Sequence, residues 1–240
     1  MLSVGAIFGN LVEIAVFASI WAVVHEIIYR SLKIPESIKA IEDRKARNIK
    51  YAFYASYYPA LIHAPTVVIL SIICILLYGI SYGQPSKPLE NFTMKFSMSY
   101  FLHDLVFGIY RKYNDGLIHA HHILCGIVLG WALFAGKYGN EACQGIALGE
   151  VTNPIYAVYD LMNMLGHSET KTRPLGIAFM VTFILIRTTL VPLSMVHVQA
   201  SHADLFYKVV YSGMWVISMM LIWMMLNKIA KLLSQVPFPP

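Results

Sequence analysis

The sequence predicts an all-α integral membrane protein with about seven transmembrane helices, and three observations support this prediction. Of its 240 residues, 58% are hydrophobic and only 13% are charged, which exceeds what one soluble core would bury. Its long apolar stretches approach or exceed the roughly 20 residues that a bilayer-spanning helix needs. The segments that connect them are mostly short. The predicted helices are, in chain order, residues 4–28, 52–80, 94–110, 117–135, 142–165, 175–198 and 206–227.

The first stretch is predicted to be a membrane helix that the protein retains. No basic region precedes it, it is longer than the apolar core of a signal peptide, and it carries Glu13, His25 and Glu26. The connection that follows, residues 29–51, has isoleucines at helical spacing and is expected to lie along the membrane interface.

Turn signals separate the remaining stretches. The segment "YGQPSKPLENF" has two prolines and predicts a turn before the third stretch, which contains "SYFLHDLVFG". The fourth stretch begins with "LIHAHHILCG", the fifth contains "LGEVTNPIYAVYD" and the sixth contains "FILIRTTLVP". The seventh, with "MWVISMMLIWMMLN", is expected to supply packing and lipid-facing bulk, and the "VPFPP" after it cannot continue a helix.

The distribution of basic residues predicts the orientation. Most lysines and arginines lie in the connections after the first, third and fifth stretches and in the C-terminal tail. The positive-inside rule therefore predicts an outside N-terminus and a cytosolic or matrix C-terminus. The expected membrane is that of the endoplasmic reticulum or the mitochondrial inner membrane. The net charge of +5 is expected to face anionic lipid headgroups, and no nucleic-acid partner is predicted.

Ionisable side chains inside the apolar stretches are the informative positions. Each costs roughly 2.5–3.5 kcal/mol at a helix centre, so it is expected to face protein, water or a partner charge. His103 and Asp104 lie in the third stretch, and His119 and His122 share a helix face in the fourth. Gly126 and Gly130 continue close to that face, where they are expected to let another helix backbone approach.

The fifth and sixth stretches carry further polar residues. Glu150, Asn153, Ala157 and Asp160 form a polar and small stripe that is expected to point into the bundle, and Pro154 frees the carbonyl of Glu150. Arg187 in the sixth stretch is the expected counter-ion for Asp104 or Glu150, or alternatively a group that only fixes which helices are neighbours. The residues expected to face a polar interior, which the family resemblance described below would make a lipid cavity, are Asp104, His103, His119, His121, His122, Glu150, Asn153, Asp160 and Arg187.

A metal site is not predicted. The chain has nine histidines, and their one cluster has the pattern H-x-H-H, whereas membrane di-iron enzymes use several spaced histidine boxes. Cys74, Cys125 and Cys143 fall in or beside apolar stretches without a C-x-x-C pair, which indicates packing and not disulfides or zinc.

An ordered set of short segments resembles the TLC domain, the family shared by ceramide synthases, TRAM-type translocon proteins and a group of small TLC-domain proteins. The resemblance covers roughly residues 40–230. The matching pieces are "DRKARN" and His63, Asp104 in "SYFLHDL", the basic "YRKYND", the pair His121-His122, Glu150 and Pro154 in "GEVTNP", "RTTLVP", and "MMLNKI".

This resemblance implies a barrel of six membrane helices around a polar cavity, preceded here by one additional helix. The expected divisions are an N-terminal helix and basic loop at 1–39, the TLC-like domain at 40–230 and a proline-rich tail at 231–240. In ceramide synthases the His-His pair and downstream acidic residues line an acyl-transfer site fed by acyl-CoA. The corresponding candidate catalytic residues here are Asp104, His121, His122 and Glu150.

One departure from the ceramide synthases favours the small TLC-domain proteins. The synthases carry a His-Asp with another Asp three residues on, where this chain has Gly149-Glu150 and then Asn153. Three functions stay open: lipid binding or handling in the cavity, a non-catalytic accessory subunit of a larger membrane complex such as a respiratory assembly, and an acyl-CoA-dependent lipid N- or O-acyltransferase. The expected partners are membrane lipids and other membrane-protein subunits, and the expected ligand is a phospholipid or acyl-CoA.

Overall fold

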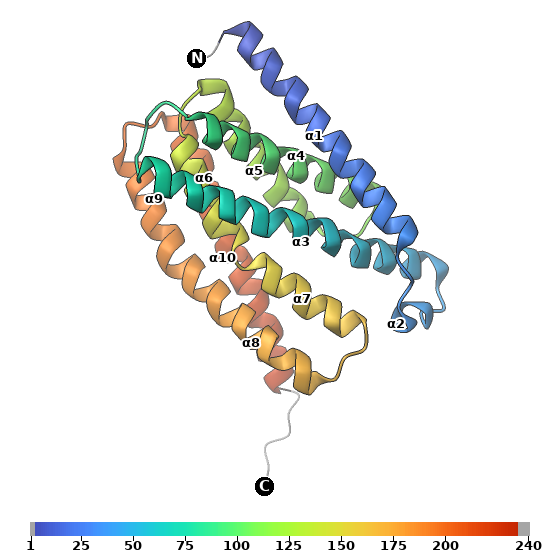
Figure 1. Ribbon diagram of the computed structural model, residues 1–240. Helices are drawn as coiled ribbons and strands as arrows, with labels where there is room; N and C mark the ends of the chain where they lie inside the picture. Colours follow the sequence, from blue (N-terminus) through green and yellow to red (C-terminus); the bar gives the residue numbers. More distant parts are fainter. Residues whose placement is uncertain (1–2, 235–240) are drawn as a thin grey trace.

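The computed structural model describes residues 3–234 and their side chains as far as Asn227, and this part of the chain is helical throughout apart from its turns (Figure 1). The predicted tail therefore lies mostly outside the described residues. The helices are α1 (Val4–Ser31), α2 (Glu36–Lys39), α3 (Arg44–Tyr78), α4 (Pro88–Arg111), α5 (Gly116–Ala135), α6 (Gly139–Glu150), α7 (Asn153–Met164), α8 (Glu169–Leu185), the π turn η1 (Ile186–Leu190), α9 (Val191–Ala200) and α10 (Leu205–Ser234).

Helix ends follow local capping chemistry. The Asp43 carboxylate accepts a hydrogen bond from the backbone N–H of Ala46 at the start of α3, and Asp115 does the same for Ile118 at the start of α5. Such caps satisfy donors that have no partner inside the helix. At the other end of α5, Gly136 has a φ of 66°, the left-handed conformation that glycine adopts without strain.

Prolines explain why the fifth and sixth apolar stretches are not single uninterrupted helices. The fifth is divided into α6 and α7 at residues 151–152, because Pro154 lacks the N–H that would bond to the carbonyl of Glu150. In the sixth stretch, the N–H of Val191 reaches back to the carbonyl of Ile186 just before Pro192, which makes the π turn η1.

The protein is an all-α membrane protein. In the described part of the chain, five helical segments are long and apolar enough to cross a bilayer: Val4–Ser31, Arg44–Tyr78, Gly116–Ala135, Glu169–Ala200 and Leu205–Asn227. The helix α4 carries several charged residues, and α6 and α7 have only 12 residues each. The expected number of about seven spans therefore stays a prediction.

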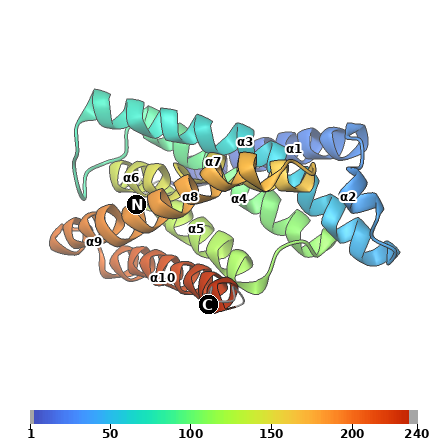
Figure 2. The same ribbon diagram turned by 90° about the horizontal axis from the view of Figure 1, so that it is seen from below.

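Neighbouring helices form a closed ring around α6. Going round, α3 packs on α4, α4 on α5, α5 on α10 and α10 on α9, which continues through η1 into α8, and α7 packs on both α8 and α3. The helices α3 and α10 lie on opposite sides of this ring in Figure 2. Because α6 also packs against α4 and α5, its side chains face the interior.

The N-terminal helix α1 lies outside this ring, against α3 and α4. Trp21 is buried there, with its ring centroid 5.3 Å from that of Tyr100. Two ion pairs join α1 to α4: Glu13 with Lys95, and Glu26 with Arg111 at 3.6 Å. Because lipid is as apolar as a leucine side chain, such packing and polar contacts, and not exclusion from water, hold helices together in a membrane.

Candidate functional site

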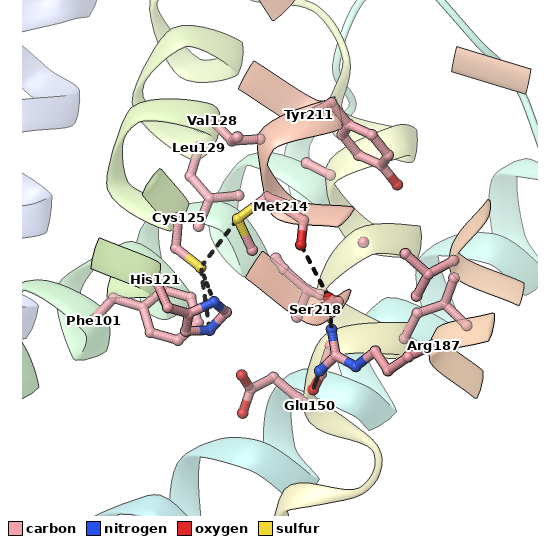
Figure 3. Close-up of a pocket in the computed structure, with 16 residues that line it drawn as sticks. Phe101, His121, Cys125, Val128, Leu129, Glu150, Arg187, Tyr211, Met214 and Ser218 are labelled. Atoms are coloured by element: carbon pink, nitrogen blue, oxygen red, sulfur yellow. Dashed lines mark hydrogen bonds between the residues drawn. The ribbon is translucent and has the colours of Figure 1, made fainter. Parts of the chain in front are cut away.

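A cavity of about 70 Å³ lies inside the ring (Figure 3). This is several times the roughly 10–15 Å³ that one water needs. The helices α4, α5, α6, α9 and α10 and the π turn provide its walls. The lining residues are Phe101, His121, Cys125, Val128, Leu129, Ala142, Gly145, Ile146, Leu148, Gly149, Glu150, Arg187, Val191, Tyr211, Met214 and Ser218.

The cavity is apolar along most of its length and polar at one end. It follows α6 from Ala142 to Glu150, a distance of about 12 Å at about 1.5 Å per residue. The apolar walls include Val128 and Leu129 of α5. Figure 3 shows His121, Glu150 and Arg187 gathered around the polar end. An apolar pocket with a few convergent polar groups is the usual form of a small-molecule site.

Arg187 reaches this end from the π turn. Its side chain is only 6% exposed, and it donates hydrogen bonds to Ser218 Oγ at 3.0 Å and to the Gly149 carbonyl at 2.7 Å. Among the described residues, neither Asp104 nor Glu150 forms an ion pair with it. The guanidinium is instead held directly by a hydroxyl and by a backbone carbonyl at the end of α6, and its role as a counter-ion stays a prediction.

Glu150 lies on the other side of the same end. It accepts a hydrogen bond from Asn153 Nδ2 at 3.0 Å, and its Oε2 lies 3.7 Å from Nδ1 of His63. His63 is fully buried, with its other ring nitrogen 3.3 Å from Ser97 Oγ and its ring stacked on Tyr100 at 3.9 Å between centroids. The carboxyl group is thus held by Asn153 of α7 and faces His63 of α3, which α4 packs against.

A second polar group surrounds Asp104, close to the α4–α5 turn. Asp104 accepts hydrogen bonds from the Tyr113 hydroxyl at 2.9 Å and from Asn114 Nδ2 at 3.2 Å. Nδ1 of His122 lies 3.3 Å from its Oδ2, although the ring is not aligned for a hydrogen bond. Burial and the Asp104 charge raise the pKa of Tyr113, which lies in the turn, so its O–H remains a donor.

Phe101 lies between these two polar groups. Its ring is 5.5 Å from His122, 6.2 Å from His121 and 5.4 Å from His63, measured between centroids. It is 5% exposed and lines the cavity, whereas His122 and Asp104 do not. His121 faces the cavity and its ring contacts the Cys125 thiol at 3.6 Å. The neighbouring histidines of the His-His pair therefore face different groups.

The other predicted cavity residues have different places. His103 pairs with His25 of α1, with 3.3 Å between ring nitrogens, and Asp160 accepts a hydrogen bond from Tyr57 of α3 at 2.6 Å. His119 lies against Gly108 with its Nε2 unpartnered, and Asn153 contacts Glu150 from outside the cavity. These positions separate because the kink at residues 151–152 ends the straight stripe and because α4 packs on both α1 and α5.

Three residues at or beside this site were not predicted from the residue pattern. His63 entered only through the resemblance, and Phe101 and Ser218 were not considered. Phe101 precedes Asp104 by three residues, so helical spacing could have placed it on the same face. Ser218 lies in the seventh apolar stretch, and no pattern in that stretch indicated which of its polar residues would face a site. In the described part of the chain, no group of three or more His, Cys, Asp or Glu side chains could hold a metal ion, and the cysteines are free.

Comparison with known protein families matches the TLC domain over residues 15–230. The chain belongs to the TLC-domain family. The match covers every helix that lines the cavity and begins within α1. The TLC domain assigns the protein to membrane proteins of lipid handling or synthesis, which agrees with a cavity of apolar walls. Whether this TLC domain is closer to the small TLC-domain proteins than to ceramide synthases stays a prediction.

Proposed function

We propose that this TLC-domain protein binds the acyl chain of a lipid in the cavity along α6 and holds the polar head with His121, Glu150 and Arg187. The observation that carries the proposal is the cavity itself. Its walls along α5, α6 and α10 are mainly apolar, and Glu150 and Arg187 lie together at one end. Hydrocarbon suits an acyl chain, and buried charged groups require polar partners, so the two parts match the two parts of a lipid.

Photolabelling tests this binding. A lipid with a diazirine in its acyl chain is added to purified full-length protein in detergent, irradiated and mapped by peptide mass spectrometry. We expect labelled residues to concentrate on the cavity side of α5, α6 and α10. Val128→Phe fills the cavity, because Val128 is 6% exposed and lines it, and should reduce labelling about tenfold, equivalent to roughly 1.4 kcal/mol.

A neighbouring position provides the control. Ile127 precedes Val128 on α5 but is 42% exposed, so Ile127→Phe places the same aromatic side chain on the outer surface. Its labelling should match that of the wild type. If the label lies on lipid-facing residues, to the same extent in the wild type, Val128→Phe and Ile127→Phe, the proposal is contradicted.

Acyl transfer is the second candidate, and the contact of His122 with Asp104 favours it. In such a reaction the imidazole would take the proton of an amine or hydroxyl nucleophile as it attacks a thioester carbonyl, and the thiolate would leave. Asp104 would orient the ring, and acyl-CoA would be a substrate. Phe101 lies between His122 and the cavity, however, so His121 is the imidazole that meets a bound chain.

An activity assay separates these two candidates. Purified protein is incubated with acyl-CoA and long-chain amines or alcohols, and acylated product is measured. Product formation that is lost in His121→Ala or His122→Ala would assign a catalytic role to that histidine. Turnover that survives both replacements would remove them from catalysis.

The orientation in the membrane and the identity of that membrane are part of the same proposal. We infer an outside N-terminus, with α2 and the α4–α5 and α7–α8 turns on the cytosolic or matrix side, in the endoplasmic reticulum or mitochondrial inner membrane. Protease accessibility of tags at either end tests the orientation. The accessory-subunit role predicts that other membrane proteins co-purify in fixed ratio after extraction in mild detergent.

A further inference from the structure

The polar end of the cavity contains a buried cation whose hydrogen bonds are not all used. Arg187 donates to Ser218 and Gly149, but its Nε has no hydrogen-bond partner in the described part of the chain. Guanidinium groups offer five N–H donors and no acceptor. A buried cation is expensive unless it is paired, so this end of the cavity can accept a group with hydrogen-bond acceptors.

The same end contains a buried carboxyl group. Glu150 is 4% exposed and lines the cavity, and Asn153 provides the hydrogen bond to its carboxyl group. When ionised, this group has about four acceptor positions, so it can still receive a donor from a ligand. Because Arg187 and Glu150 flank one space without pairing, they offer a donor and an acceptor, of opposite charge, to one head group.

This arrangement discriminates between head groups by charge. A carboxylate would be attracted by Arg187 but opposed by Glu150, and an ammonium would be attracted by Glu150 but opposed by Arg187. A plain hydrocarbon would leave both groups unpaired. A neutral head with a hydroxyl next to a carbonyl or ether oxygen satisfies both, because the hydroxyl donates to Glu150 and the oxygen accepts from Arg187.

We propose that the cavity selects neutral single-chain lipids whose head carries a hydroxyl donor beside a carbonyl or ether acceptor, the chemistry of a monoacylglycerol. This inference rests on the proposed function, because it assumes that an acyl chain occupies the apolar part of the cavity. It adds the class of head group, for which Arg187 and Glu150 are the specificity-determining residues.

Competition with a fixed photoprobe tests the inference. Purified protein is labelled with the diazirine lipid in the presence of 1-oleoylglycerol, oleate, oleylamine or octadecene, all with the same chain length. We expect 1-oleoylglycerol to halve the labelling at a concentration about tenfold lower than the others, which corresponds to roughly 1.4 kcal/mol. If oleate or oleylamine competes as well as or better than 1-oleoylglycerol, the inference is overturned.

Charge-removing variants test the assigned residues. Glu150→Gln removes the charge that opposes a carboxylate, so oleate should gain at least about fivefold relative to 1-oleoylglycerol, roughly 1 kcal/mol. Arg187→Gln should instead favour oleylamine. Glu36→Gln is the matched control, because it removes a carboxylate charge from the exposed helix α2, away from the cavity, and it should keep the wild-type order. An unchanged order in both charge variants would contradict the assignment.

Failure of the inference can be distinguished from failure of the proposed function. If Val128→Phe abolishes the labelling but the four competitors act equally on the wild type, the acyl chain binds in the cavity and head-group selection is overturned. Labelling that is insensitive to Val128→Phe overturns both. The competition series on the wild type decides the question even if a charge variant does not fold.

Discussion

The carboxylate of Asp104 lies 3.3 Å from Nδ1 of His122, and this contact joins α4 to α5 beside the turn that connects them. Tyr113 and Asn114 of the same turn donate hydrogen bonds to the two carboxylate oxygens. A residue of the third apolar stretch, the turn and the His-His pair therefore form one polar group. Asp104 fixes the turn, whatever the chemistry of the histidine.

Removal of the Asp104 carboxylate should destabilise the protein. Asp104→Ala leaves the Tyr113 hydroxyl and the Asn114 amide without their acceptor, which costs about 1–3 kcal/mol for buried polar groups. Tyr113→Phe removes only one donor and should cost less, about 0.5–1.5 kcal/mol. Thermal unfolding midpoints in detergent measure both. An Asp104→Ala protein as stable as the wild type would contradict this account.

Gly108 permits the approach of Asn114 to Asp104. A Cβ at position 108 would lie 2.6 Å from Asn114 Nδ2 and 3.3 Å from His119 Nε2. Gly108→Ala should therefore displace Asn114 and lower stability by about 1–3 kcal/mol, as overpacking commonly does. The measurement is again the unfolding midpoint in detergent, with the amide contact checked in a structure of the variant.

Gly126 provides the control for this substitution. A Cβ there would meet no atom within 4 Å, and one at Gly130 would meet the Met98 side chain at 3.4 Å. The expectation that these glycines admit another helix backbone is therefore wrong. Gly126→Ala should leave stability unchanged or raise it by about 0.5–1 kcal/mol, since alanine is the better helix former.

Asp204 should make stability depend on acid pH. It lies in the turn before α10 and accepts hydrogen bonds from the Tyr207 N–H at 2.8 Å, Trp131 Nε1 at 3.0 Å and the Tyr138 hydroxyl at 2.9 Å. Partial burial raises its pKa, but these hydrogen bonds outweigh burial and hold the pKa of Asp204 below its ordinary value.

The sign of this effect follows from linkage. The stabilisation by Asp204 is present above the unfolded-state pKa of about 3.9 and is lost as pH falls through the lower folded-state pKa. Asp204→Asn should abolish this part of the acid dependence, and Asp204→Ala should cost about 1 kcal/mol at neutral pH through loss of the helix cap. Unfolding midpoints from pH 3 to pH 7 test both, and identical acid profiles for wild type and Asp204→Asn would refute the assignment.

The pair of His25 and His103 should hold α1 against the ring. Both side chains are buried, and Phe107 stacks on His25 with 4.7 Å between centroids. His25→Ala removes this packing and the partner of His103 Nε2, so it should cost about 1–3 kcal/mol. His167 lies exposed in the α7–α8 turn, and His167→Ala should leave the unfolding midpoint within experimental error. Equal midpoints for the two variants would rule out this role of the pair.

The sequence by itself determined the membrane class, the approximate helix positions and most of the polar residues that needed an explanation. Hydropathy suffices for this, because a bilayer demands long apolar helices and penalises each buried charge wherever it occurs. Asp104 and Glu150 were identified in this way, and His121 through the resemblance alone. The order of the short segments indicated the TLC domain that the family comparison confirmed. Pro154 likewise marked the place where the fifth stretch bends.

Only the tertiary structure decided which of these polar residues meet. Helical spacing gives the face on which a side chain lies, but not the helix opposite it. The kink after Glu150 directs Asp160 toward Tyr57 of α3, and the packing of α1 on α4 takes His103 to His25. The π turn brings Arg187 to a backbone carbonyl in place of a carboxylate. These pairings depend on distant segments packing together, and a single sequence does not encode that packing in any local pattern.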